Sequence, residues 1–127
     1  MFTERDWILR VAKELAAFIA RALKLGEAQK NDEALELLQG ACTGLFGMEF
    51  RILSMVDAKS AVDLLGEPAR GLAFAELLEA MAKVEIDPLR REARLRHALS
   101  IVDEVRARAP KHADAAAQGE RLERALR

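Results

Sequence analysis

The sequence predicts an all-α protein of six or seven helices, and three observations support this fold class. Ala and Leu supply most of the apolar residues in a chain of 127 residues that is 51% hydrophobic and 32% charged, and both lose little conformational freedom in a helix. Apolar residues recur at spacings of three and four and do not alternate with polar ones. Gly and Pro fall between the periodic segments, where helices end. The length suits a single domain spanning residues 1–127.

The first predicted helix covers about residues 4–25 and is apolar around most of its circumference. Trp7, Val11, Phe18 and Ile19 follow the helical period, and several alanines widen the apolar face. A helix of this kind is buried on more than one side. We therefore expect either a central helix or a dimer surface, with Gly26 ending the helix.

The second predicted helix covers residues 32–46, with Asn31 or Asp32 as its N-terminal cap. Gly40 and Gly44 lie four residues apart and so share one side of this helix. Glycine is costly inside a helix, which predicts close approach of a neighbouring backbone on that side.

The boundaries of the remaining helices are predicted from the capping and breaking residues at their ends. A segment at 48–56 precedes a short helix that Asp57 caps and Gly66 ends, and Pro68 opens a helix to about residue 86. Asp87-Pro88 opens a helix to residue 108, and a last helix covers 112–126. The chain thus predicts two helical hairpins, 4–46 and 68–108, joined by a helical insert, 48–66, and closed by a C-terminal capping helix.

The second helix of each hairpin carries the same packing pattern. Ala34, Leu38 and Ala41 in one copy correspond to Ala98, Val102 and Val105 in the other, where Pro110 follows. This pattern resembles the second helix of the tetratricopeptide repeat: a small residue, a large one four later, a small one seven later and Pro at twelve. The copies lie 64 residues apart (98 − 34) and lack the Trp-x-x-Leu-Gly-x-x-Tyr pattern of the family's first helix. The chain is thus similar to a degenerate repeat protein.

The whole arrangement also resembles a small bacterial family of uncharacterised helical proteins. The residues that carry this resemblance are Asp6-Trp7-Ile8 and Glu33-Ala34-Leu35. The two resemblances together imply a scaffold that binds proteins, and neither implies a known activity.

The residues that could support catalysis are few. His97 and His112 fall on different predicted helices, and Cys42 lies among apolar residues as a buried, inert thiol. Arg90 and Arg94 lie near His97 at helical spacing and disfavour its protonation. No metal-ligand spacing and no phosphate-binding loop occur. We expect no enzyme, no catalytic residue, no metal and no cofactor.

The distribution of charge and the targeting signals limit where we expect the protein to be and what we expect it to bind. Residues 1–87 hold 10 Lys and Arg against 15 Asp and Glu, whereas residues 88–127 hold 10 against 6, so the two parts of the chain can attract each other. A single cysteine fits a reducing compartment. Neither a signal peptide nor a stretch able to span a membrane is recognisable. We expect a cytoplasmic protein with no membrane association.

Two surfaces remain as candidates for function. The first is the aromatic face of the first helix, with Trp7, Val11, Phe18 and Ile19, which favours a protein–protein interaction module that forms a homodimer. The second is a basic face of helix 88–108, formed by Arg90, Arg94, His97 and Arg108, which would suit a nucleic-acid-associated regulator.

Nucleic acid is the weaker of the two predictions. Glu92 can pair with Arg96, Glu104 interrupts the basic face, and no aromatic side chain is near enough to stack on bases. A solvated face, or one that docks on the acidic part of the chain, explains these cations equally well. The sequence does not identify the protein partner.

Overall fold

The computed structural model describes the chain from residue 4 to residue 127, with side chains from Asp6 onward. Seven α helices and no strands form this part of the molecule, which confirms the predicted all-α fold of six or seven helices. They are α1 (Glu4–Glu27), α2 (Asn31–Phe46), α3 (Phe50–Met55), α4 (Ala58–Leu65), α5 (Pro68–Val84), α6 (Pro88–Arg108) and α7 (Ala113–Ala125).

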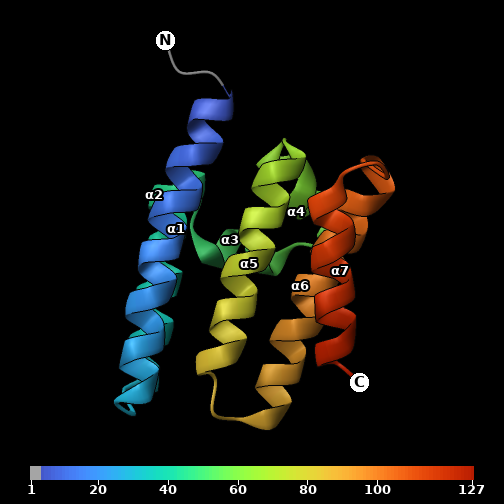
Figure 1. Ribbon diagram of the computed structural model, residues 1–127. Helices are drawn as coiled ribbons and strands as arrows, with labels where there is room; N and C mark the ends of the chain where they lie inside the picture. The colour runs from blue at the N-terminus through green and yellow to red at the C-terminus, as the bar shows by residue number, and fades with distance from the viewer. Residues whose placement is uncertain (1–3) are drawn as a thin grey trace.

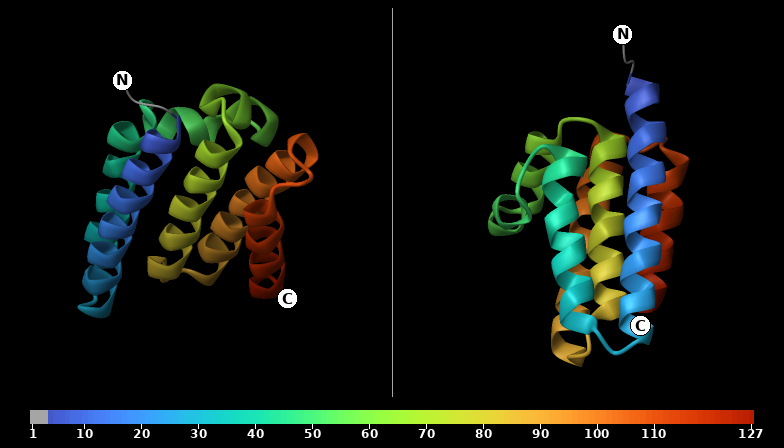
Figure 2. Two further views of the ribbon diagram at one scale, coloured as in Figure 1. Left: turned by 45° about the horizontal axis from the view of Figure 1, so that its top comes forward. Right: turned by 90° about the vertical axis from the view of Figure 1, so that its left-hand side faces the viewer.

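The long helices form two layers. Helices α1, α5 and α7 lie in the front layer of Figure 1, and α2 and α6 lie behind them. The side view in Figure 2 shows that α5 is set back between α1 and α7, and that α3 and α4 lie together at one end of the back layer. Helix α1 packs on α2, and α5 packs on α6. Two hollows lie over α5 on this side, between α1 and α7.

Helix α5 is the centre of the core. Eleven of its 17 residues are buried, because α1, α2, α4, α6 and α7 all contact it. Phe74 lies in the middle of α5, where its ring is 5.9 Å from that of Phe46, 6.3 Å from that of Phe50 and 6.1 Å from that of His97. One aromatic side chain thus joins α2, α3, α5 and α6.

Local capping chemistry sets the starts of two helices, as the sequence predicted. The Asp57 carboxylate accepts a hydrogen bond from the backbone N–H of Ser60 at 2.8 Å, and this bond lowers the pKa of Asp57. The Asp87 carboxylate accepts from the N–H of Leu89 at 3.0 Å. Each bond satisfies a donor that has no partner within the helix.

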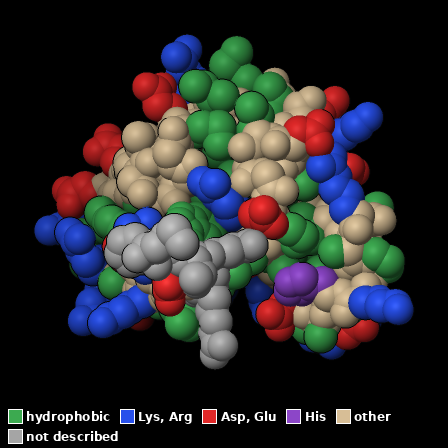
Figure 3. Space-filling view, turned by 90° about the horizontal axis from the view of Figure 1, so that it is seen from above, with side chains coloured by type: hydrophobic (Ala, Val, Ile, Leu, Met, Phe, Trp, Pro, Cys, Tyr) green, Lys and Arg blue, Asp and Glu red, His purple; other side chains and the backbone are tan. Residues whose placement is uncertain are grey.

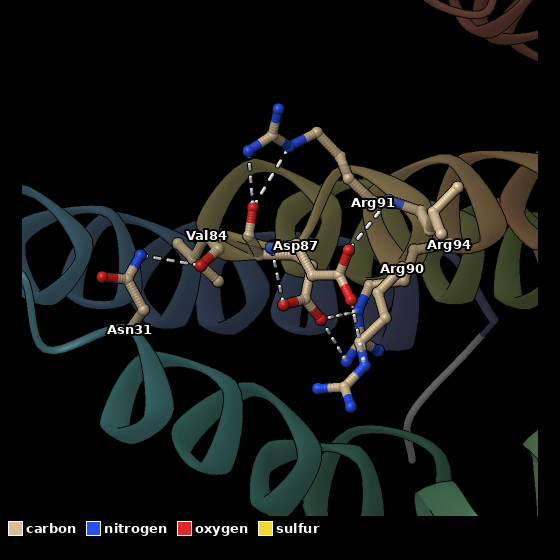
Figure 4. Close-up of polar contacts among 8 residues, drawn as sticks. Asn31, Val84, Asp87, Arg90, Arg91 and Arg94 are labelled. Carbon is tan, nitrogen blue, oxygen red and sulfur yellow. Dashed lines mark hydrogen bonds and ion pairs between the residues drawn. The ribbon is translucent and has the colours of Figure 1, made fainter.

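The start of α2 differs from the prediction. Lys30 occupies the cap position without a side-chain capping bond, and Asn31 is the first residue of the helix. Asn31 Nδ2 instead donates to the carbonyl oxygen of Val84 at 2.8 Å (Figure 4). Val84 ends α5, where carbonyl groups lack partners within the helix. The tertiary bond to α5 therefore replaced the local capping role expected for Asn31 or Asp32.

A second polar cluster holds the turn between α5 and α6. The Glu85 side chain is buried, and its Oε1 lies 3.1 Å from Arg94 Nη2. Arg91 donates from Nε and Nη2 to the Glu85 carbonyl oxygen at 3.1 and 2.8 Å (Figure 4). The buried carboxylate is thus paired with a cation, as burial of a charge requires.

The helices approach closely at Gly71, and they do not do so at Gly40 or Gly44, where the sequence predicted it. A Cβ atom added to Gly40 or Gly44 would meet no atom within 4 Å, so the expectation of a neighbouring backbone there is wrong. At Gly71 a Cβ would lie 2.8 Å from Val105 Cγ2, which makes this the tight contact between α5 and α6. Gly26 does not end α1, which continues to Glu27, and a left-handed residue, Gln29, follows.

Candidate protein-binding groove

A groove runs along the concave front of the molecule, with α5 as its floor and α1 and α7 as its walls. Its upper part is a hollow of about 420 Å³ and its lower part a hollow of about 290 Å³. Glu76 and Arg121 border both hollows, which lie in line along α5, and we call the two together the α1–α5–α7 groove. Figure 3 looks down on the upper end of this side of the molecule.

The floor of the groove is mostly small and apolar. Ala69, Leu72, Ala73 and Ala80 border the two hollows. Ala69 and Ala73 are partly exposed, whereas Leu72 and Ala80 are buried beneath them. The small side chains of Ala69 and Ala73 leave room for side chains of another helix on this part of the floor.

The α1 wall supplies the large apolar side chains. Trp7, Ile8, Val11 and Leu15 border the upper hollow, and Ile19 borders the lower one. The Arg70 guanidinium carbon lies 4.7 Å from the centre of the Trp7 ring, and Arg70 Nη2 donates to the Phe46 carbonyl oxygen at 2.9 Å. This cation–π contact fixes the aromatic side chain at the upper end of the groove.

The α7 wall is attached to the floor by polar contacts. Gln118 Nε2 donates to the Leu72 carbonyl oxygen at 3.2 Å. Arg121 donates from Nε and Nη2 to the two carboxylate oxygens of Glu79, both at 2.8 Å, and this pair raises the pKa of Arg121. A bidentate pair of this geometry is among the stronger side-chain contacts. The groove is therefore preformed, with its width set by these bonds.

Polar groups without strong partners line the same groove. Glu76 is exposed in the middle of the floor, and Arg121, whose charge it interacts with, forms its hydrogen bonds with Glu79. On the α7 wall, Nδ1 of His112 is buried and has no hydrogen-bond partner among the described residues. Glu76 is therefore accessible to an occupant of the groove, whereas the buried Nδ1 atom of His112 is not.

The first predicted interaction surface divides between the core and this groove. Val11 is only 1% exposed, whereas Trp7, Phe18 and Ile19 are partly buried against the core. Trp7, Val11 and Ile19 border the groove; Phe18 borders neither hollow. Three of the four predicted residues therefore lie on one wall of the groove, and Phe18 lies outside it.

The predicted basic face is divided among separate ion pairs. Arg90 Nε lies 3.6 Å from Asp87, and Arg94 pairs with Glu85. Arg108 Nη1 lies 2.7 Å from Asp63 in α4, and Arg108 Nε lies 3.0 Å from Glu104. His97 is half-buried against Phe74. The cations thus dock on acidic residues of the same chain, and no continuous stripe of unpaired cations remains among these four.

Of the three groups considered for catalysis, His112 borders the groove, whereas Cys42 and His97 lie apart from it. Cys42 is fully buried in α2, and burial raises the pKa of its thiol to about 12. Burial, and then the charge of Arg94, lowers the pKa of His97. Among the side chains that the structure describes, no group of three or more His, Cys, Asp or Glu could hold a metal ion. Within the same part of the chain, no helix is long and apolar enough to cross a membrane.

Sequence reasoning missed the floor and the α7 wall. The floor residues belong to a helix whose apolar sequence predicts core. The available signal was the charged residues within this helix, of which Glu76 and Lys83 are exposed in the structure. The position of α7 depends on contacts such as Gln118 to Leu72, across 46 residues of sequence.

Comparisons with protein-family models, with curated proteins and with solved structures find no match for this chain.

Proposed function

We propose that this protein is a non-enzymatic protein–protein interaction module and that it binds its partner in the α1–α5–α7 groove. The observation that supports this most is the recessed floor of α5, which presents small apolar residues between two helical walls. A groove between helices that is lined by apolar side chains and a few polar groups suits an amphipathic helix of another chain. The unpaired, buried Cys42 suits a reducing compartment, so we place the protein in the cytoplasm.

The groove also contains the features of an interface centre. Trp7 is held in place by Arg70, and a rigid aromatic side chain gives large contact area at low entropic cost. Glu76 provides an exposed polar group beside this apolar surface. These features support binding by shape and apolar contact, with a few polar groups that select the partner.

Affinity purification from the native source tests this function. The tagged wild-type protein is compared with Ala73→Arg, which places a charged side chain on the groove floor, and with Gly40→Arg. Gly40 lies on α2 and no atom lies within 4 Å of a Cβ there, so this control adds the same charge away from the groove. We expect wild type and Gly40→Arg to retain the same bound protein and Ala73→Arg to lose it.

A second groove variant shows whether loss of the partner comes from the groove or from misfolding of Ala73→Arg. Ala117→Arg changes an exposed residue of the α7 wall, and thermal unfolding monitored by circular dichroism shows which variants are folded. If the folded groove variants retain the same partner as wild type, or if wild type retains no protein at all, the proposed function is wrong.

A further inference from the structure

We propose that the occupant of the groove is helix α1 of a second copy of this chain, so that two copies each place α1 in the groove of the other. This inference depends on the proposed function, because it identifies the partner that the groove binds. Three features of the molecule support it: the exposed face of α1, the shape of the groove floor and the position of two opposite charges.

The first feature is an exposed face of α1 that borders the groove. Leu9, Ala12, Ala16 and Ala20 are separated by three or four residues, so they lie along one side of the helix, and all four are exposed. Leu9 is a large apolar residue that is 62% exposed. Ala12 also lines the upper hollow, so the apolar surface continues from the groove over the edge of α1.

The second feature is the match between this face and the floor of the groove. The floor is formed by Ala69, Leu72, Ala73 and Ala80 over about three turns of α5. Two helix faces made mainly of alanine approach closely. The face of α1 and the floor of α5 are therefore similar in length.

The third feature is a pair of opposite charges. Glu76 is an exposed carboxylate in the middle of the floor. Lys13 is exposed on α1, next to Ala12 and four residues after Leu9, so it lies beside the exposed apolar face. Within the described part of the chain, Lys13 has no hydrogen bond or ion pair. An ion pair between Lys13 and Glu76 across the two copies would satisfy both charges.

A twofold axis brings these charges together. Glu76 borders one hollow with Leu15 and the other with Ile19, so it lies level with the middle of α1. If two α1 helices pair in opposite directions about an axis near Leu15, Lys13 of the second copy lies level with Ala17 of the first, beside Glu76. The same contact then forms twice, as a twofold-symmetric interface requires.

Sedimentation velocity over a range of about 1 to about 200 µM tests this inference on the whole protein. We expect the wild type to dimerise. Because the charge pair occurs twice in the interface, Glu76→Lys or Lys13→Glu alone should weaken dimerisation by about 10- to 100-fold. The double variant Glu76→Lys/Lys13→Glu should recover it. Glu36→Lys changes an exposed residue of α2 by the same charge and should leave the dimer unchanged.

The other outcomes contradict the inferred dimer, and one of them also contradicts the proposed function. A wild-type protein that stays monomeric at the highest concentration overturns the inference, as does a dimer that neither single reversal weakens or that the double variant fails to recover. If the protein is monomeric but the groove captures a different protein, the inference that a second copy is the partner is wrong and the proposed function remains. If the groove captures no protein either, the inference and the proposed function are both wrong.

Discussion

Replacement of Gly71 by alanine tests the tight contact between α5 and α6 on which the floor of the groove rests. The new Cβ would lie 2.8 Å from Val105 Cγ2 and 4.0 Å from Val62 Cγ2. Apolar carbon atoms pack at about 3.5 to 4.0 Å, so the first distance is shorter than contact by roughly 1 Å. Val105 is fully buried and its side chain is short and β-branched, so it has little freedom to move away.

Two opposing effects give the size of the change. Extra volume in a packed core costs about 1–3 kcal/mol, whereas alanine in place of glycine within a helix contributes about 0.5–1 kcal/mol. We expect Gly71→Ala to lower the free energy of unfolding by about 1–2 kcal/mol, because the clash exceeds the gain in helix propensity. Gly40→Ala has the same gain in propensity and no atom to meet, so it should raise stability by about 0.5–1 kcal/mol.

Urea unfolding of both variants measures these changes, and a double-mutant cycle with Val105→Ala isolates the clash. Val105→Ala removes the atom that the new Cβ meets, so the effects of the two substitutions should be less than additive by about 1 kcal/mol. Two results would show that α5 and α6 do not approach closely at Gly71. One is that Gly71→Ala stabilises the protein as much as Gly40→Ala does; the other is that the effects of Gly71→Ala and Val105→Ala are additive.

Three further results are expected. Asn31→Ala removes the bond to the Val84 carbonyl and should lower the free energy of unfolding by about 1 kcal/mol; an unchanged urea midpoint would contradict that role. The pKa of His97 is lowered by burial and then by Arg94, so the unfolded chain binds this proton more readily. Stability should therefore fall as the pH decreases below about 6.5, and His97→Leu should flatten the stability–pH profile, which unfolding between about pH 5 and pH 7 measures. Cys42, with its thiol pKa raised to about 12, should react with a thiol reagent only when the protein unfolds; rapid reaction of the folded protein would refute its burial.

The predicted basic face leads to a result that distinguishes the two candidate functions. Arg94 and Arg108 are paired with Glu85 and Asp63 of the same chain. We expect random DNA and RNA not to bind even at low salt, since binding requires cations that are free to displace counterions from phosphates. Fluorescence anisotropy measures this, and tight binding that weakens steeply with added salt would favour the nucleic-acid alternative.

The helix boundaries that were predicted correctly depend on local chemistry. Asp57, Pro68 and Asp87 mark helix starts because the carboxylates cap nearby N–H groups and proline needs no N–H at the first turn. Gly66 ends α4 with a positive φ of 88°. Each of these effects involves residues within one turn of each other, so the sequence contains all the information they need.

The features that were predicted incorrectly depend on contacts between distant residues. Asn31 has the chemistry of a cap, yet its partner is Val84, 53 residues away. Gly40 and Gly71 are both glycines inside helices, and only the packing of α6 distinguishes them. Periodicity shows which residues lie on one side of a helix, but it does not show which neighbour covers that side.

The same limit explains what could be predicted of the groove. The apolar period of α1 placed Trp7, Val11 and Ile19 on one face, and the structure brings them to one wall. The other wall depends on Arg121 and Glu79, which lie 42 residues apart. The resemblance to tetratricopeptide repeats stays a prediction, and so does self-association through α1.

Site-specific photo-cross-linking tests the central claim most directly, because it records what lies in the groove. A benzophenone amino acid is incorporated at position 117, on the exposed α7 wall of the groove, and in a second protein at position 40, on α2. After irradiation in the native source, we expect a protein adduct from position 117 and none from position 40. An adduct of twice the chain's 14.1 kDa would identify a second copy. Equal adducts from both positions, or no adduct from position 117, would contradict the assignment of the α1–α5–α7 groove as the protein-binding surface.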